Sequence, residues 1–177
     1  MNIVVIGAGI SGLSTAYLLV ENGHTVTILS KAFSPNITSN KAAAFWFPYH
    51  VRSDKRAIVW VEKSYQFYKK LTSDNNSGIS FIKLVKGIKG GVADDDSWVQ
   101  FMPLNTCRQL PVKDLPIGYH KGFKAEVPLI ETQIFLPYLQ QQLLQKGVVF
   151  IEKNVTNLLD ISHQFDAVVN CSGLGAK

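Results

Sequence analysis

The first thirty residues show a hydrophobic pattern that predicts a strand, a helix and a second strand. Residues 3–6 are a short β-branched run, typical of a strand buried on both faces. Residues 13–21 repeat apolar side chains at helical spacing, and the Asn-Gly pair that follows is expected to end the helix. Residues 25–29 form a second β-branched run. The chain is therefore expected to begin with two parallel strands joined by a helix.

The turn between the first strand and the helix reads Gly-Ala-Gly-Ile-Ser-Gly over residues 7–12. In a β-α-β context this spacing indicates a dinucleotide site. Gly7 permits the tight turn, Gly9 lets the backbone approach a pyrophosphate, and Gly12 lets helix and strand pack closely. The helix N-terminus directs free N–H groups and a partial positive charge at the phosphates. We therefore predict a dinucleotide site at this turn.

The second strand lacks the acidic residue that usually follows the glycines by about 20 positions and holds the ribose hydroxyls. This strand ends in Ser30 and Lys31 instead. A serine would keep part of the contact through a weaker, neutral hydrogen bond. Lys31 would instead meet a 2′-phosphate, which would mean NADP. The glycines alone do not choose between these two ligands.

Two segments follow this unit. Residues 31–51 form a long irregular stretch of small residues and then aromatic ones, which fits a ligand-facing loop and a hydrophobic plug equally well. Residues 54–71 repeat apolar side chains at helical spacing, with Asp54 as the expected cap. The face expected to join the core consists of Ile58, Val61, Tyr65 and Tyr68.

From residue 79 to 130 the pattern changes to short β runs with polar interruptions. Strands are expected at residues 79–85, 98–102 and 122–128. The acidic run at residues 94–96 has no other metal-ligating side chains at suitable spacing, so we expect a solvated turn and no metal site.

The last part of the chain returns to the pattern of its beginning. Thr132 is expected to cap a helix that Pro137 interrupts early and that ends at Gln145. Residues 148–151 and 167–170 are apolar runs, which predict two more buried strands of the parallel sheet.

Composition excludes several classes of function. The 177 residues carry a net charge of +5 from scattered lysines without a basic stripe, which argues against nucleic acid. The uncharged stretch at residues 3–20 lacks a basic flank and contains three glycines, so we expect neither a signal peptide nor a membrane span. Cys107 and Cys171 form no disulfide framework, and a cytoplasmic location is expected. The four isolated histidines have no triad-like partners, and no residue is assigned a catalytic role.

Longer motifs resemble a known family. They read GAGISGLSTA from residue 7, FSP from residue 33, TSNKAAAFWFPY from residue 38, VPLIETQIFLPYLQQQLLQKGVVF from residue 127 and DAVVNCSGLGA from residue 166. Together they resemble the N-terminal half of the D-amino-acid oxidase family of flavoenzymes. The resemblance runs along the whole chain and is weakest between residues 74 and 122.

The resemblance implies an α/β fold: a Rossmann-like FAD-binding domain with a partial antiparallel substrate domain inserted. Residues 1–77 would be the first part of the FAD-binding domain, 78–130 the partial substrate domain, and 131–177 the second part of the FAD-binding domain. The implied reaction is oxidation of a D-amino acid to its imino acid, with hydride passing to FAD and electrons then to O₂.

The resemblance also implies which residues hold FAD. The glycine turn, including Ala8 and Ser11, would hold the pyrophosphate, and Ser30 and Lys31 would lie by the adenosine.

Two further pairs match positions nearer the flavin. Thr38 and Ser39 match the family's hydroxyl pair on the phosphates and ribityl chain. Ala44 and Phe45 match the backbone segment that faces the isoalloxazine ring.

Three positions near the C-terminal end complete the implied site. Val155 would contact adenine through its backbone, and Ser172 and Gly173 would close over the diphosphate. In the family the arginine that clamps the substrate carboxylate lies beyond the matching region, so a complementing C-terminal half or self-association is expected. The alternative is a non-catalytic nucleotide-binding module or fragment that holds FAD or NADP.

Overall fold

The computed structural model describes residues 1–42, 44–48, 55–91 and 96–176, which form two compact units. The first unit consists of Met1–Ala43, Asn76–Gly78 and Glu131–Lys177, and the second of Ala44–Asn75 and Ile79–Ile130. Residues 44–75, expected in the FAD-binding domain, are therefore grouped by their contacts with the antiparallel sheet. The functional domain boundaries stay a prediction.

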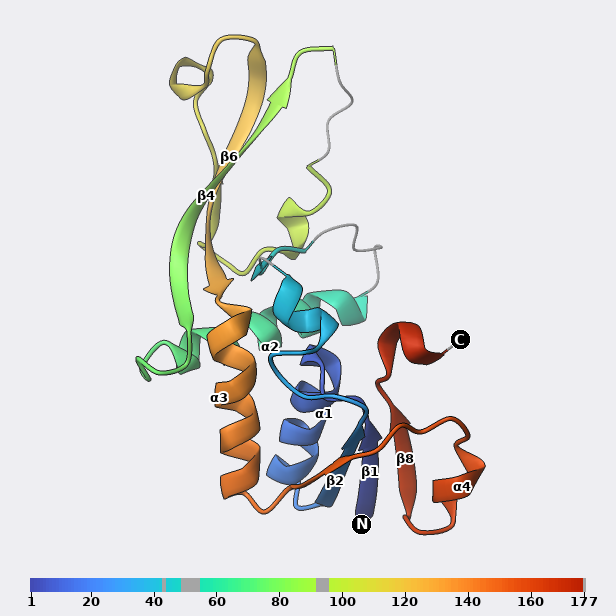
Figure 1. The fold of residues 1–177 in the computed structure, drawn as a ribbon. Helices are drawn as coiled ribbons and strands as arrows, with labels where there is room; N and C mark the ends of the chain where they lie inside the picture. The colour runs from blue at the N-terminus through green and yellow to red at the C-terminus, as the bar shows by residue number, and fades with distance from the viewer. Residues whose placement is uncertain (43, 49–54, 92–95, 177) are drawn as a thin grey trace. The chain divides into compact units, whose positions relative to one another are not determined.

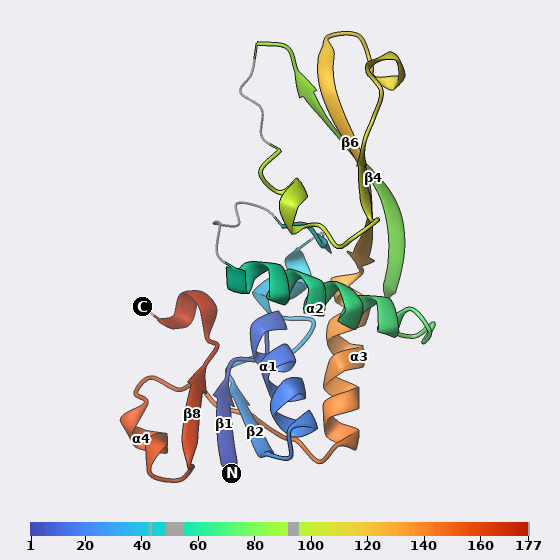
Figure 2. The same ribbon diagram turned by 180° about the vertical axis from the view of Figure 1, so that it is seen from behind.

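The first unit is built on a four-stranded parallel sheet with the order β7-β2-β1-β8 (Figure 1). Its strands are β1 (Asn2–Ile6), β2 (Thr25–Ser30), β7 (Val149–Glu152) and β8 (Ala167–Asn170). Helices α1 (Ile10–Glu21) and α3 (Thr132–Gln145) lie side by side in Figure 1 and, seen from behind, in Figure 2. The short helix α4 (Leu159–Ser162) precedes β8. Strand β1, helix α1 and strand β2 form the β-α-β unit that the sequence predicts.

The two central strands of this sheet are buried on both faces. Consecutive residues of β1, Val4 and Val5, are both fully buried, although successive side chains of a strand point to opposite faces. Strands β7 and β8 belong to the parallel sheet, as predicted, but the prediction that they are buried is wrong, since both are edge strands whose side chains are exposed or half-buried. Val149 and Ile151 of β7 are accordingly 52% and 44% exposed.

Helix α3 has the predicted bounds but a different N-cap residue. Glu131, not Thr132, is the N-cap residue, and the Thr132 hydroxyl donates to the Ala42 carbonyl at 2.9 Å. The helix also continues through Pro137, where the sequence predicted an interruption. Its buried face stabilises it there, because tertiary packing contributes most of a helix's stability. That face consists of Phe135, Leu136, Leu139 and Leu143.

The second unit contains an antiparallel sheet with the order β3-β6-β4, and β5 also pairs with β6. Its strands are β3 (Ala44–Phe45), β4 (Ile79–Lys89), β5 (Cys107–Gln109) and β6 (Tyr119–Ile130). Strands β4 and β6 form the long paired ribbon of Figure 1, with Ile79 opposite Ile130 and Gly87 opposite Gly122. The antiparallel strands predicted near both ends of this segment are therefore confirmed.

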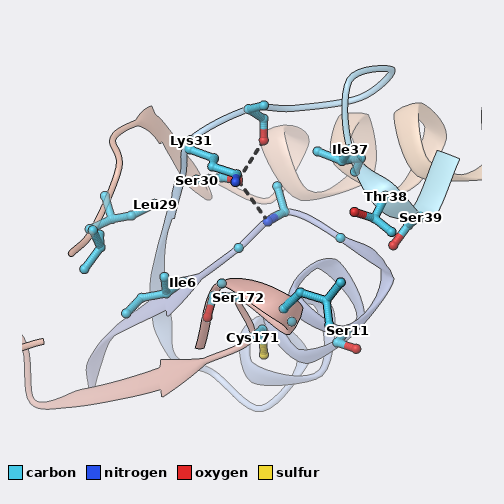
Figure 3. Close-up of a pocket in the computed structure, with 18 of the residues that line it drawn as sticks. Ile6, Ser11, Leu29, Ser30, Lys31, Ile37, Thr38, Ser39, Cys171 and Ser172 are labelled. Carbon is cyan, nitrogen blue, oxygen red and sulfur yellow. Dashed lines mark hydrogen bonds between the residues drawn. The ribbon is translucent and has the colours of Figure 1, made fainter. Parts of the chain in front are cut away.

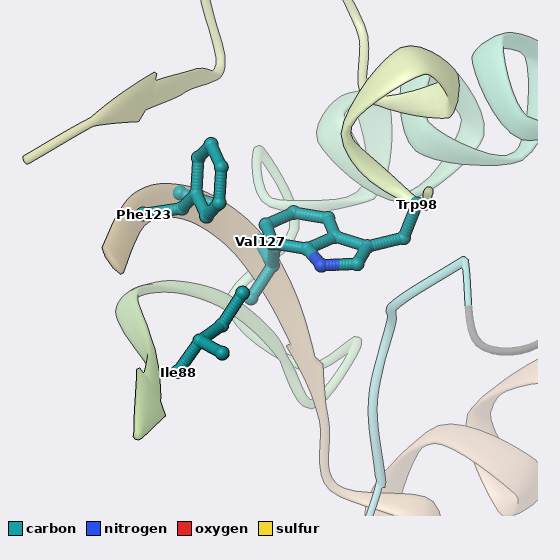
Figure 4. Close-up of a cluster of buried hydrophobic side chains, with 5 residues drawn as sticks. Ile88, Trp98, Phe123 and Val127 are labelled. Atoms are coloured by element: carbon teal, nitrogen blue, oxygen red, sulfur yellow. The ribbon is translucent and has the colours of Figure 1, made fainter. Parts of the chain in front are cut away.

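The strand predicted at residues 98–102 is wrong, since a 3₁₀ helix, η2 (Val99–Phe101), occupies this place. Trp98 and Phe101 are both 3% exposed, and side chains three apart share one face of a 3₁₀ helix. Trp98 packs edge-on against Phe123, with ring centroids 5.5 Å apart. Figure 4 shows Trp98, Phe123, Ile88 and Val127 together in this buried cluster.

Helix α2 (Lys55–Leu71) belongs to the second unit. Tyr65 lies on its buried face and donates its hydroxyl proton to the Glu126 carbonyl at 3.2 Å. Ile58, predicted on this face, is 49% exposed, and Ala57 is buried in its place. Asp54, the expected cap, lies outside the described residues. Of the predicted face, Tyr65 is therefore confirmed as a core residue, Val61 and Tyr68 are half-buried, and the prediction is wrong for Ile58.

Candidate nucleotide site

A pocket of about 580 Å³ lies at the carboxyl ends of the parallel strands in the first unit. This is the edge of an open α/β sheet where ligands bind. Four parts of the chain line it: the glycine turn, the end of β2 with the segment after it, the segment after β7, and the segment after β8. Figure 3 shows Ser30, Ser39, Cys171 and Ser172 converging around the turn.

Two of the three motif glycines are required by the fold itself. Gly7 has a φ of +101°, and a Cβ there would lie 2.5 Å from the Cys171 carbonyl oxygen. A Cβ on Gly12 would lie 1.8 Å from the Gly7 carbonyl oxygen, so α1 could not pack against the turn. The predicted roles of Gly7 in the turn and of Gly12 in close packing therefore have a direct geometric basis.

Gly9 differs from both, because the backbone does not require it. Its φ is −74°, which any residue adopts, and a Cβ there would meet only the Ser39 hydroxyl, at 3.0 Å. Gly9 lines the pocket, so a side chain at this position would project into it. The missing side chain leaves room in the pocket and lets the Ser39 hydroxyl approach the helix N-terminus.

The N-terminus of α1 faces this pocket. Its N-cap residue, Gly9, has no side chain to accept a hydrogen bond, and the Ser39 hydroxyl oxygen accepts one from the Ile10 N–H at 3.1 Å. Ser39 belongs to the 3₁₀ helix η1 (Thr38–Lys41). Its hydroxyl thus lies at the positive end of the helix, beside the glycine turn.

Ser30 ties the end of β2 to the glycine turn (Figure 3). Its hydroxyl accepts a hydrogen bond from the Ala8 N–H at 3.3 Å and donates one to the Ala32 carbonyl at 2.7 Å. Ser30 is 7% exposed. Because its only proton is used internally, Ser30 can accept a bond from a ribose hydroxyl but cannot donate one to a phosphate.

The pocket is electropositive. Lys31, Lys41 and Lys153 line it, and none of its described lining residues is Asp or Glu. The sequence did not single out Lys41, Lys153 or Cys171 as site residues. Cys171 directly follows β8 and is half-buried. The carboxyl-end rule for parallel sheets would have drawn attention to Lys153, which directly follows β7.

Most of the residues implied by the resemblance come together here. The pocket is lined by Gly7, Ala8, Gly9, Ser11, Ser30, Lys31, Thr38, Ser39, Val155, Ser172 and Gly173. Gly12 lies behind the turn, where it contacts Gly7. Ala44 and Phe45 form β3 in the second unit and do not line the pocket. The ligand contacts of all these residues stay predictions.

Two absences hold for the described part of the chain. No three His, Cys, Asp or Glu side chains among these residues are grouped so that they could hold a metal ion. Within the same ranges, no helix has the length and apolar character needed to cross a bilayer.

Comparisons with known proteins agree with this geometry. The D-amino-acid oxidase of Rubrobacter xylanophilus is 29% identical over 175 residues, covering 98% of this chain and 53% of that protein. The D-amino-acid oxidase of Streptomyces coelicolor is 30% identical over 177 residues, covering 99% and 53%. The chain thus spans about half the length of these relatives.

The fold agrees as well. The structure of L-α-glycerophosphate oxidase from Mycoplasma pneumoniae with FAD bound superposes with a TM-score of 0.64 at 16% identity, covering 88% of this chain and 46% of that one. The model of the family described as FAD dependent oxidoreductase matches residues 2–177. The chain therefore belongs to the FAD dependent oxidoreductase family, and its cofactor is FAD.

Proposed function

We propose that this chain is the FAD-binding part of an amino-acid oxidase that acts on D-amino acids. The single observation that carries the proposal is Gly9, which the backbone conformation does not require and whose Cβ would meet only the Ser39 hydroxyl on the pocket wall. An open cradle at a helix N-terminus fits a pyrophosphate, since a bulky side chain there would occupy the phosphate's place. The pocket's lysines balance the negative charge of that group.

In this proposal the chain's own residues bind and orient the cofactor. The N-terminus of α1 and the Ser39 hydroxyl hold the pyrophosphate, and Ser30 accepts from a ribose hydroxyl. Ser172 and Gly173, just after β8, close the pocket on its other side. When bound, FAD would supply the redox chemistry, which is hydride transfer from the amino acid and reoxidation by O₂.

The choice of a D-amino acid rests on the names of the relatives, which are D-amino-acid oxidases. Binding a substrate carboxylate in a closed site calls for a bidentate arginine. Arg56 lies over the Trp60 ring at 5.6 Å, and Arg108 is exposed on β5. Arg52 lies outside the described residues. We therefore propose that a complementing segment supplies the substrate clamp. We also propose a cytoplasmic location, which the two free cysteines support.

The test measures FAD binding by the purified chain together with its thermal unfolding. We expect the wild-type chain to bind FAD, Gly9→Ala to weaken binding and Gly9→Val to abolish it, all with unchanged circular dichroism. Gly90→Ala is the matched control, because its Cβ would meet only the Gly118 carbonyl, at 3.9 Å, outside the pocket. Normal FAD binding by Gly9→Val would show that the cofactor lies elsewhere.

A second measurement separates the oxidase from a non-catalytic module. Peroxide release is assayed across D- and L-amino acids, with the chain alone and with a co-expressed C-terminal half of a related oxidase. We expect turnover of D-amino acids only in the complemented sample. Turnover by the chain alone would contradict the proposal that another segment supplies the substrate clamp. A complex that binds flavin but shows no turnover would favour a non-catalytic binding module.

A further inference from the structure

Lys31 and Lys153 directly follow two neighbouring strands of the parallel sheet, at one end of the pocket. Strands β2 and β7 pair in parallel with Ser30 opposite Glu152, so the next residues, Lys31 and Lys153, are neighbours. The Lys153 N–H donates to the Ser30 carbonyl oxygen at 2.9 Å, which fixes the two chain segments together at this point. Both lysines line the pocket.

Among the described residues, neither lysine has an acidic partner that would explain the pair. Within the described ranges, neither Lys31 nor Lys153 forms an ion pair, and Glu152 is not among the residues that line the pocket. Adjacent like charges repel one another. A binding site that holds two such charges together is therefore suited to a ligand group with more than one negative charge.

The neighbouring hydroxyl cannot serve that group. The Ser30 proton is donated to the Ala32 carbonyl, so at this end of the pocket the lysine ammonium groups are left to bind an anion. In dinucleotide folds an acid at the end of the second strand selects a free ribose hydroxyl, whereas a basic residue there accommodates a ribose phosphate. This chain has Ser30 and Lys31 at that place.

We propose that Lys31 and Lys153 form a subsite for a phosphate carried on the adenosine ribose. Adenine nucleotides phosphorylated on the ribose then bind this pocket more tightly than their unphosphorylated counterparts and compete with FAD for it. The inference shares one assumption with the proposed function, which is that the pocket binds a nucleotide. FAD itself carries no such phosphate, so the two ideas make separate predictions.

The experiment is calorimetry on the full chain, freed of bound nucleotide, with four ligands. They are FAD, adenosine 5′-monophosphate, adenosine 2′,5′-bisphosphate and adenosine 3′,5′-bisphosphate, and the last two distinguish the position of the phosphate. We expect one bisphosphate to bind about tenfold more tightly than the monophosphate, as one charge-assisted hydrogen bond allows. Lys31→Gln and Lys153→Gln should each reduce this ratio, and Lys31→Glu should reverse it.

Two control variants separate the subsite from general charge. Lys41→Gln changes a pocket lysine on η1 and should weaken the three adenylates alike, leaving their ratio unchanged. Lys113→Gln changes an exposed lysine in the second unit and should affect none of them. A ratio that survives the Lys31→Gln/Lys153→Gln double substitution would overturn the subsite.

The outcomes also separate this inference from the proposed function. If FAD binds and the three adenylates bind with equal affinity, the subsite is overturned and the cofactor assignment stays intact. A tightly bound bisphosphate without FAD binding would support the subsite and overturn the proposed function. If no nucleotide binds, both are wrong.

Discussion

The parallel sheet of the first unit and the antiparallel sheet of the second bury apolar surface in different ways. In β1 consecutive residues are buried, so both faces of the strand are covered. In β4 exposed and partly buried residues alternate through Lys83, Leu84, Val85 and Lys86, and only one face joins the aromatic cluster. The first arrangement leaves the strand ends free to form a site, whereas the second uses its loops to complete the core. The following predictions test this division, in order of decreasing effect.

The largest effect is expected at Gly12. A Cβ there would lie 1.8 Å from the Gly7 carbonyl oxygen, which belongs to a turn that cannot shift without disturbing β1. We expect Gly12→Ala to cost about 3 kcal/mol or more of unfolding free energy, because overpacked backbone must move. Hydrogen exchange should accelerate in peptides of β1 and α1. A variant as stable as wild type would show that close packing at the turn is not essential.

The matched substitution in the second unit is Trp98→Ala. Trp98 is 3% exposed and packs against Phe123 and Phe47, so its loss leaves a large cavity. We expect a cost of about 3 kcal/mol by urea unfolding, at the lower end of the range for truncated core aromatics. Hydrogen exchange should accelerate in β4 and β6, and Val99→Ala, which removes less buried surface on the same 3₁₀ helix, is the control. Faster exchange confined to β1 and β2 would contradict the division into two units.

The same comparison explains how much the sequence could predict. The β-α-β unit was predictable because strand, glycine turn and helix lie within thirty consecutive residues and each constrains the next. Trp98 and Phe101 were misassigned because a five-residue apolar run does not distinguish a strand from a 3₁₀ turn. The lysine pair was missed because pairing of β2 with β7 joins Lys31 to Lys153, far apart in the chain. Exposure of the edge strands likewise depends on the order of the sheet, which no local pattern contains.

A smaller effect is expected at Ser30, where the site and the fold of the first unit meet. Ser30→Ala removes the partner of the Ala8 N–H and of the Ala32 carbonyl. We expect a loss of about 1–3 kcal/mol in unfolding free energy, since buried polar groups are left unsatisfied, together with weaker FAD binding. Thermal unfolding and flavin titration measure the two effects. Ser30→Thr keeps the hydroxyl and is the control, and unchanged stability of Ser30→Ala would contradict the bridging role.

The smallest effect concerns the ion pair between α1 and α3. Lys146 Nζ lies 2.6 Å from Glu21 Oε1, and this hydrogen bond raises the pKa of Lys146 above its ordinary value of 10.5. A raised lysine pKa stabilises the folded state fully below 10.5, and the contribution is lost as the pH rises through the higher folded value. We therefore expect the coupling between Glu21→Gln and Lys146→Gln, measured by urea unfolding in a double-mutant cycle, to be small at neutral pH and to vanish above that value. Coupling that persists or grows there would mean that packing of Lys146 over the Tyr17 ring, and not its charge, joins the two helices.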